Sequence, residues 1–256
     1  MRLIGTDALV LHLFDYRETS RIVRLVTRDA GVISAVARGA RRPRNKYGAA
    51  LDLFASGIAQ LAMHGSRDLH GLNAFDAGRS RPELAESLDR FAAANVIAEL
   101  CLRFGRAAET GSLYAAVATS LDAIAAVEPH EAAATGLASA WQLVAEFGFA
   151  PAVTECALCH AELNGDATFN HRAGGALCAR CARQAHGGRR LPDEARRALR
   201  GWLAGDAVAV DAAAARAHLR LLREFLEEHL GDGRPLRAFL AWEQRLGRRR
   251  QVVRAP

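Results

Sequence analysis

The first 80 residues have the pattern of a series of short β-strands. Apolar residues there alternate with polar ones or form short β-branched runs, and turn-forming residues separate the runs. A period of two is typical of strands that bury one face. The pattern predicts five strands, over Thr6–Leu13, Arg21–Thr27, Val32–Arg38, Phe54–Met63 and Leu69–Ala77.

The close spacing of these strands favours a small barrel. No predicted helix separates them, whereas a parallel sheet needs a crossover of about a dozen residues between neighbouring strands. Five strands in this arrangement are typical of the oligonucleotide-binding barrel, the OB-fold, and an SH3-like barrel is the alternative. We predict an N-terminal five-stranded OB-fold barrel.

Beyond Arg81-Pro82 the apolar residues follow the period of helices. Pro82, Pro192 and Pro235 suit first helical turns, and Trp141, Trp202 and Trp242 lie on apolar helical faces, where we expect them in the core. The chain is therefore an α+β multidomain protein in which a helical domain follows the barrel. The predicted helices are 82–102, Ser112–Ala126, Glu131–Phe147, Asp193–Leu203, Ala212–Leu230 and Pro235–Arg245.

Two Cys-x-x-Cys pairs interrupt the helical part of the chain. Cys156 and Cys159 form the first pair and Cys178 and Cys181 the second, with 18 residues between them that include Gly174-Gly175. Such pairs direct both sulfurs to one point, and two pairs supply the four thiolates of a closed tetrahedral zinc site around a β-hairpin. We predict one structural Zn²⁺ per chain, because a closed site leaves no position for catalysis.

Composition makes a membrane or secreted protein improbable. Apolar residues make up 50% of the chain and charged residues 24%, but no run reaches the roughly 18 apolar residues of a membrane span. The first residues lack the basic and small-residue signals of a secretory leader. Five cysteines, four of them clustered, do not resemble a disulfide framework. We expect a protein of the cytoplasm that contacts no membrane.

A basic segment lies between the third and fourth predicted strands. Residues 38–48 hold five cations and no acid. OB barrels bind single strands with cations along the backbone and aromatic rings under the bases, so Tyr47, Phe14 or Tyr16 is expected to stack on a base. A solvated turn with incidental charge is the alternative. The candidate contacts in this segment are Arg38, Arg41, Arg42, Arg44 and Lys46.

Other cations are weaker candidates. Arg21 and Arg24 lie on the second predicted strand but on opposite faces, so at most one joins a given patch. The cationic run 245–251 near the end is either a second phosphate contact or a helix end with favourable charge.

Charge and pattern together divide the chain into four parts. Net charge is +5 over residues 1–80, −6 over 81–155 and +7 over 156–256, which sum to the +6 of the whole chain. We predict an OB-fold nucleic-acid-binding domain over 1–80, the first part of a helical domain over 81–155, the four-cysteine zinc module over 156–181 and the second part of the helical domain over 182–256.

No catalytic motif is found in the sequence. Walker, nucleophile-elbow, H-E-x-x-H and G-x-G-x-x-G patterns are absent. His160-Ala161-Glu162 followed by Cys178-x-x-Cys181 is similar to the signature of zinc deaminases, but no proline precedes Cys178 and the first cysteine pair would have no role. We predict a protein that is not an enzyme.

A barrel with a basic loop, a helical body and an inserted pair of Cys-x-x-Cys motifs together resemble the bacterial RecO family of recombination mediators. The resemblance implies a DNA repair protein that binds single- and double-stranded DNA, anneals complementary strands and, with RecR, helps RecA to replace single-strand-binding protein. It also implies a cytoplasmic, nucleoid-associated location and, in some members, binding of the acidic tail of single-strand-binding protein. The resemblance is carried by residues 15–23, 25–27, 31–43, 147–151 and 229–231.

Within the resemblance, the matching site residues are the cations of the basic segment and the four cysteines. The competing interpretations are a zinc-ribbon OB protein that binds structured RNA, and an adaptor whose charges serve a protein partner.

Overall fold

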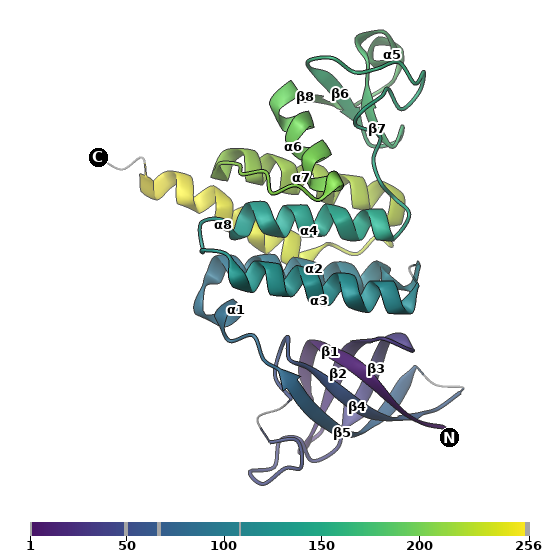
Figure 1. The fold of residues 1–256 in the computed structure, drawn as a ribbon, viewed down its shortest axis with the longest axis vertical. Helices are drawn as coiled ribbons and strands as arrows, with labels where there is room; N and C mark the ends of the chain where they lie inside the picture. Colours follow the sequence, from purple (N-terminus) through teal and green to yellow (C-terminus); the bar gives the residue numbers. More distant parts are fainter. Residues whose placement is uncertain (1, 49–50, 66–67, 108, 254–256) are drawn as a thin grey trace. The chain divides into compact units, whose positions relative to one another are not determined.

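The computed structural model describes residues 2–48, 51–65, 68–107 and 109–253. The chain forms two compact units, one of Met1–Leu88 and Ile97–Ala126 and the other of Asp89–Val96 and Val127–Pro256. We call them the barrel unit and the helical unit; Figure 1 shows their elements. Helix α2 (Leu88–Phe104) contributes residues to both. The four-part division expected from the sequence stays a prediction.

Five strands of the barrel unit form a closed barrel in the order β1-β2-β3-β5-β4. Neighbouring strands are antiparallel, except that β3 and β5 are parallel. This arrangement confirms the predicted five-stranded OB-fold barrel. The strands are β1 (Arg2–Tyr16), β2 (Ser20–Thr27), β3 (Gly31–Ala37), β4 (Ser56–Met63) and β5 (Leu69–Arg79).

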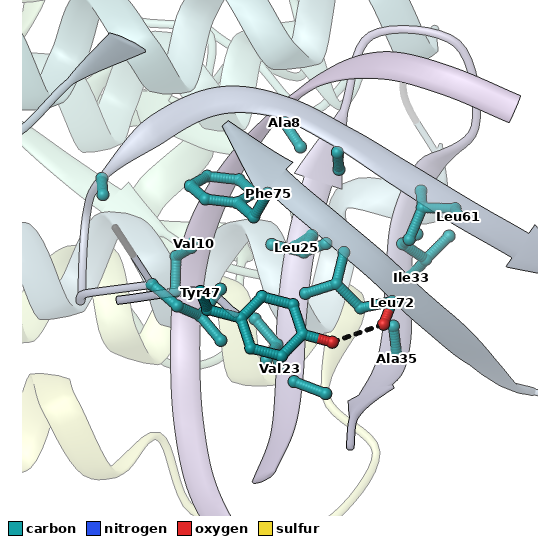
Figure 2. Packing of buried hydrophobic residues seen from close by; sticks show 14 residues of the cluster. Ala8, Val10, Val23, Leu25, Ile33, Ala35, Tyr47, Leu61, Leu72 and Phe75 are labelled. Atoms are coloured by element: carbon teal, nitrogen blue, oxygen red, sulfur yellow. Dashed lines mark hydrogen bonds between the residues drawn. The ribbon is translucent and has the colours of Figure 1, made fainter. Parts of the chain in front are cut away.

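Alternate residues of the strands fill the barrel. Val23 and Leu25 of β2 point inward, as do Ile33 and Ala35 of β3, and small alanines leave room for the larger side chains (Figure 2). Tyr47 enters this core from the segment after β3 and is 3% exposed. Its hydroxyl donates a hydrogen bond of 2.6 Å to the carbonyl of Leu72, so its one polar atom is satisfied inside the barrel.

The barrel unit also contains α1 (Glu83–Glu86), the 3₁₀ helix η1 (Gly105–Ala107) and α3 (Thr110–Ala126). Arg81, which is 5% exposed, joins α3 to the barrel. Its Nε lies 2.6 Å from Asp122, and its Nη1 donates to the carbonyl of Phe54 at 2.7 Å and to Ser56 Oγ at 2.8 Å. A buried guanidinium with these partners orients the helix, because loss of the Asp122 contact leaves a buried charge unpaired.

Helices and a small sheet make up the helical unit. Its helices are the first part of α2, α4 (Ala132–Glu146), α5 (Ala179–Gln184), α6 (Asp193–Ala204), α7 (Ala212–Leu230) and α8 (Arg237–Val253). Trp141, Trp202 and Trp242 are fully buried, which confirms their predicted place in the core. A Cβ at Gly136 would lie 2.7 Å from Ala93 Cβ, so only glycine lets α4 approach α2 this closely.

Most helix boundaries lie within a few residues of the predicted ones, with two exceptions. Ser87 is extended (φ −129°, ψ 125°) and separates α1 from α2, where the sequence predicted one helix. Helix α8 continues to Val253, beyond the expected end at Arg245. Among the described residues, no helix is long and apolar enough to cross a membrane.

Candidate nucleic-acid interface and metal centre

Three connecting segments meet at one end of the barrel. They are the β1–β2 turn, the segment after β3 and the β4–β5 connection, and they line a groove of about 890 Å³. OB barrels bind oligonucleotides between these same β1–β2 and β4–β5 loops. The groove therefore lies where this fold presents a ligand site. Its lining residues are Tyr16, Arg17, Glu18, Thr19, Ser20, Val36, Arg38, Gly39, Arg42, His64, Leu69, His70 and Gly71.

The segment after β3 places its cations at the surface. Gly39 adopts a left-handed conformation (φ 73°) that starts the turn. Asn45 then fixes the loop, because its amide donates to the carbonyl of Arg42 at 3.1 Å and its Oδ1 accepts from the Tyr47 N–H at 2.9 Å. Arg38 and Arg42 line the groove. The exposed side chains of this segment include the predicted contacts Arg38, Arg41, Arg42, Arg44 and Lys46.

Arg21 and Arg41 share one carboxylate beside the groove. Arg21 Nε lies 3.4 Å from Asp15 Oδ1, and Arg41 Nε lies 3.4 Å from Asp15 Oδ2. Arg41 Nη1 also donates to the carbonyls of Arg17 at 3.3 Å and Glu18 at 3.2 Å. The structure thus brings Arg21 and Arg41 together at the β1–β2 turn.

Arg24 lies apart from these cations. Its neighbours Val23 and Leu25 point into the barrel, which puts Arg24 on the outer face of β2. Its Nη2 donates to the carbonyl of Leu102 at 3.3 Å. Burial, and then the nearby cation Arg106, lower the pKa of Arg24. The structure groups Arg24 with α2, and its expected contact with nucleic acid stays a prediction.

The expectation that Tyr47 stacks on a base is wrong, because this ring lies in the barrel core. Burial raises the pKa of Tyr47 to about 12. Lys46 lies over the Tyr47 ring, with its Nζ 5.1 Å from the centroid. The two other aromatic candidates stay accessible: Tyr16 lines the groove and Phe14 is 42% exposed.

Among the arginines and histidines of the groove, Arg17, His64 and His70 were not predicted. His70 Nδ1 accepts a hydrogen bond of 3.2 Å from the His64 N–H. Burial, and then His64, lower the pKa of His70, so this ring is neutral near pH 7 and presents its Nε2–H as a donor. Arg17 and His64 lie in turns between predicted strands, whereas His70 lies in the predicted strand Leu69–Ala77. No signal in the sequence indicates that the three meet, because their convergence follows from the strand order.

Four cysteine sulfurs meet in the helical unit. The Sγ atoms of Cys156, Cys159, Cys178 and Cys181 lie within 4.8 Å of one another, and those of Cys159 and Cys178 are 3.8 Å apart. Zn–S bonds of about 2.3 Å in a tetrahedron place sulfurs about 3.8 Å apart. The four cysteines therefore have the donor atoms and the spacing to hold a metal ion.

The backbone prepares the first cysteine pair for a cation. His160 adopts φ 57°, and its N–H closes a turn on the carbonyl of Cys156 at 2.9 Å. Burial acts to raise the pKa of the Cys156 thiol, but the N–H groups of Cys178, Leu158 and Cys159 outweigh it and lower this pKa to about 6. A thiolate stabilised in this way is the form that binds metals.

A three-stranded sheet lies beside the cysteines, in the order β7-β6-β8. Strands β6 (Ala167–Asn170) and β7 (Gly175–Leu177) form a hairpin between the two cysteine pairs, and Gly174 closes its turn with φ 76°. This is the hairpin that the sequence predicted. Strand β8 (Arg189–Leu191) was not predicted, because three residues with two arginines carry no strand pattern.

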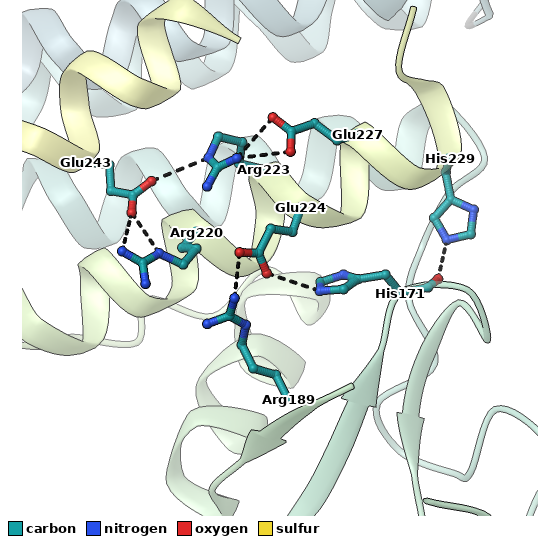
Figure 3. A network of polar contacts seen from close by, with 8 residues as sticks. All are labelled: His171, Arg189, Arg220, Arg223, Glu224, Glu227, His229 and Glu243. Atoms are coloured by element: carbon teal, nitrogen blue, oxygen red, sulfur yellow. Dashed lines mark hydrogen bonds and ion pairs between the residues drawn. The ribbon is translucent and has the colours of Figure 1, made fainter. Parts of the chain in front are cut away.

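Polar contacts tie this sheet to α7 (Figure 3). Glu224 of α7 lies 2.6 Å from Arg189 Nη2 and 3.3 Å from His171 Nε2. His229 Nε2 lies 2.6 Å from the carbonyl oxygen of His171. Burial lowers the pKa of His171 against the opposing effect of Glu224, so Arg189 is the permanent cation of the group. The sheet beside the four cysteines and α7 are thereby held in one arrangement.

The deaminase-like ligand set is not formed by the described residues. His160 is exposed, and its Nδ1 pairs with Glu155 Oε1 at 3.0 Å instead of joining the sulfurs. In the predicted cationic run 245–251, the side chains of residues 248–251 lie outside the described residues. Arg245, the first residue of the run, binds Asp89 Oδ1 at 2.7 Å.

Comparisons with known proteins match nearly the whole chain. The family models "Recombination protein O N terminal" and "Recombination protein O C terminal" match residues 1–81 and 85–238. DNA repair protein RecO of Anaeromyxobacter sp. is 34% identical over 248 residues, 93% of this chain and 95% of the relative.

Other bacteria contain similar proteins. DNA repair protein RecO of Symbiobacterium thermophilum is 33% identical over 80% of this chain and 82% of its own length. The protein of the same name from Gloeobacter violaceus is 32% identical over 86% of this chain and 85% of its own length. Because both family models and these relatives match the barrel and the helical part alike, the chain belongs to the RecO family.

Proposed function

We propose that this chain is a DNA-binding recombination mediator. It binds single- and double-stranded DNA, promotes annealing of complementary strands and, with RecR, helps to load RecA on DNA coated by single-strand-binding protein. Membership of the RecO family supports the proposal, since the relatives are named DNA repair proteins.

The observation that carries the proposal is the set of exposed cations around the groove at the end of the OB barrel. Arg17, Arg38 and Arg42 line the groove, and Arg41 and Arg21 lie beside it. Cations that neutralise phosphates release counterions from DNA, and this release drives binding without regard to sequence. The Tyr16 ring offers a surface for stacking of a base.

Annealing requires no catalytic group. A protein that binds the sugar-phosphate backbone leaves the base edges free for pairing, and neutralised phosphates let a second strand approach. The proposed activity is therefore not enzymatic, and we assign no catalytic residue.

We assign Zn²⁺ to the four cysteines. Cys156, Cys159, Cys178 and Cys181 would hold the ion in a closed tetrahedral site, where it stabilises the fold and offers no open position to a substrate. The role of the four cysteines is then structural. With the ion bound they would fix the neighbouring sheet, from which Arg189 and His171 contact Glu224 of α7.

The proposed partners are DNA, RecR, RecA and the acidic C-terminal tail of single-strand-binding protein. Membership of the family supports these partners. We propose that the chain acts in the cytoplasm in association with the nucleoid. We propose that the helical unit receives the acidic tail.

An annealing assay tests the function. Complementary strands are coated separately with cognate single-strand-binding protein and mixed, and duplex formation is followed by fluorescence transfer between end labels. We expect the chain to accelerate annealing, and the double variant Arg38→Ala, Arg42→Ala to lose most of the acceleration. An annealing rate equal to that without the chain would contradict the proposed function.

A further inference from the structure

Asp15 lies between two arginines at the end of the barrel that carries the groove. Each of its two carboxylate oxygens faces a different guanidinium group, at 3.4 Å from Arg21 Nε and 3.4 Å from Arg41 Nε. We propose that Arg21 and Arg41 form a phosphate subsite, and that Asp15 holds the place of the DNA phosphate in the free protein. This inference rests on the proposed DNA binding.

The shape of the carboxylate supports the inference. A phosphodiester, like a carboxylate, carries one negative charge over two oxygens that accept hydrogen bonds, and guanidinium groups bind both. Two arginines that already converge on the oxygens of Asp15 are therefore placed to receive the two free oxygens of one phosphate.

The contacts of Asp15 are weak enough to be exchanged. A distance of 3.4 Å exceeds the 2.7–2.9 Å typical of charge-assisted hydrogen bonds. The side chains of Asp15, Arg21 and Arg41 are 57%, 39% and 39% exposed, and ion pairs this accessible contribute little to stability. By comparison, Asp7 of the same strand lies 2.7 Å from Arg28.

Arg41 keeps its position without Asp15, and β2 fixes the backbone of Arg21. Arg41 Nη1 is held by the carbonyls of Arg17 and Glu18, and the Arg41 N–H donates to the carbonyl of Thr19 at 3.0 Å. Arg21 lies in β2, where it pairs with Ala37 of β3. A phosphate that displaces Asp15 therefore meets an Arg41 guanidinium that is already in place and an Arg21 whose backbone is fixed, and less conformational entropy is lost on binding.

The variant Asp15→Asn tests the subsite, because it removes the competing charge and keeps the shape of the side chain. We measure binding of a fluorescent oligothymidylate by anisotropy at several salt concentrations. Affinity should rise about 3- to 10-fold, since a unit charge several ångströms from the phosphate no longer repels it. The magnitude of the salt slope should rise by about 0.7 to 1, because Asp15 no longer neutralises one unit of positive charge, which then contributes to counterion release.

Two controls separate the subsite from a general effect of charge. Asp7→Asn makes the same change on the same strand, but at the pair with Arg28, and should leave the affinity within about 2-fold of the wild type. In the background Arg21→Gln, Arg41→Gln, the change Asp15→Asn should give no gain, because its effect requires the two arginines.

Each outcome has one meaning. A wild-type chain that binds no oligonucleotide in dilute buffer contradicts the proposed function itself. If the wild type binds the oligothymidylate and Asp15→Asn binds it equally well or more weakly, the proposed subsite is wrong and the proposed DNA binding still stands. Melting temperatures show whether the variants are folded, and Asp15→Ser replaces Asp15→Asn if the amide destabilises the turn.

Discussion

His218 is a buried histidine without a polar partner. It lies in α7, is 2% exposed and packs edge-on against Trp202 with ring centroids 4.7 Å apart. Neither ring nitrogen has a hydrogen-bond partner among the described residues. Burial therefore lowers the pKa of His218 from 6.5 to about 4.

This pKa makes the helical unit sensitive to acid. The unfolded chain takes up the proton below pH 6.5, whereas the folded chain takes it up only near pH 4. The contribution of neutral His218 to the free energy of unfolding is thus fully present above pH 6.5. It falls by about 3 kcal/mol as the pH drops to 4. Between pH 6.5 and pH 4, the free energy of unfolding of the variant His218→Phe should therefore fall by about 3 kcal/mol less than that of the wild type. Urea unfolding at several pH values measures this difference.

Tryptophan fluorescence is a suitable probe for this experiment, because all three tryptophans lie in the helical unit. The control is His130→Gln, which changes an exposed histidine of the same unit. Equal pH dependence in His218→Phe and the wild type would show that His218 titrates normally in the folded chain.

Single residues also show the limits of sequence interpretation. The charge of Arg38, Arg41 and Arg42 was evident, and these residues are exposed as a basic loop requires. The burial of Tyr47 was not evident, because Tyr47 lies among charged residues in the sequence and enters the core through a turn fixed by Asn45. Local sequence reports the charge of a loop but not which of its side chains folds inward.

At the scale of elements, the sheet beside the four cysteines supports α7 through polar contacts. The two cysteine pairs enclose the β6–β7 hairpin, whose sheet presents Arg189 and His171 to Glu224. Cys156→Ser should lose the bound metal and lower the melting temperature of the helical unit by about 10 °C or more, because metal binding supplies folding energy to small modules. Metal analysis and tryptophan fluorescence on heating check both effects.

Cys101→Ala is the matched control for this variant. Cys101 is a buried cysteine outside the four-sulfur cluster, and burial raises its pKa to about 12, so it stays a thiol. This control should retain one metal ion per chain. A Cys156→Ser variant with full metal content and an unchanged melting temperature would exclude the structural metal site.

Pairing partners explain which elements the sequence predicted well. β1 is longer than the predicted Thr6–Leu13 because it pairs with β4 along Arg2–Leu9 and with β2 along Ala8–Tyr16, and the β1–β2 pairing has a register shift between Val10 and His12. A strand that changes partners does not keep one alternation along its whole length. β8 was not predicted because its extended conformation comes from pairing with β6, and its own three residues carry no strand pattern.

At the scale of the whole molecule, the groove depends on barrel topology. The β1–β2 turn, the basic segment and the β4–β5 connection are separated by up to about 50 residues in the sequence. The strand order of the predicted OB-fold brings these three segments to one end of the barrel. Once the fold is predicted, the basic end of the barrel can therefore be predicted as well. The pairing of Asp15 with Arg21 and Arg41 depends on side-chain geometry, which no spacing in the sequence encodes.

The central claim is that the cations around the groove bind DNA phosphates. Its most direct test compares the salt dependence of oligothymidylate binding between the wild type and the double variant Arg38→Ala, Arg42→Ala. The matched control is Arg28→Ala, Arg79→Ala, which removes two exposed cations of the barrel unit that pair with Asp7 and Asp122. Both variants change the net charge equally, so only the position of the lost cations differs.

The account predicts that the logarithm of the wild-type affinity falls linearly with the logarithm of the salt concentration. Loss of the groove cations should weaken binding and reduce the slope by about 0.7 for each phosphate contact removed, whereas the control should keep the wild-type slope. A groove variant with the affinity and slope of the wild type would contradict the claim that DNA binds at this end of the barrel.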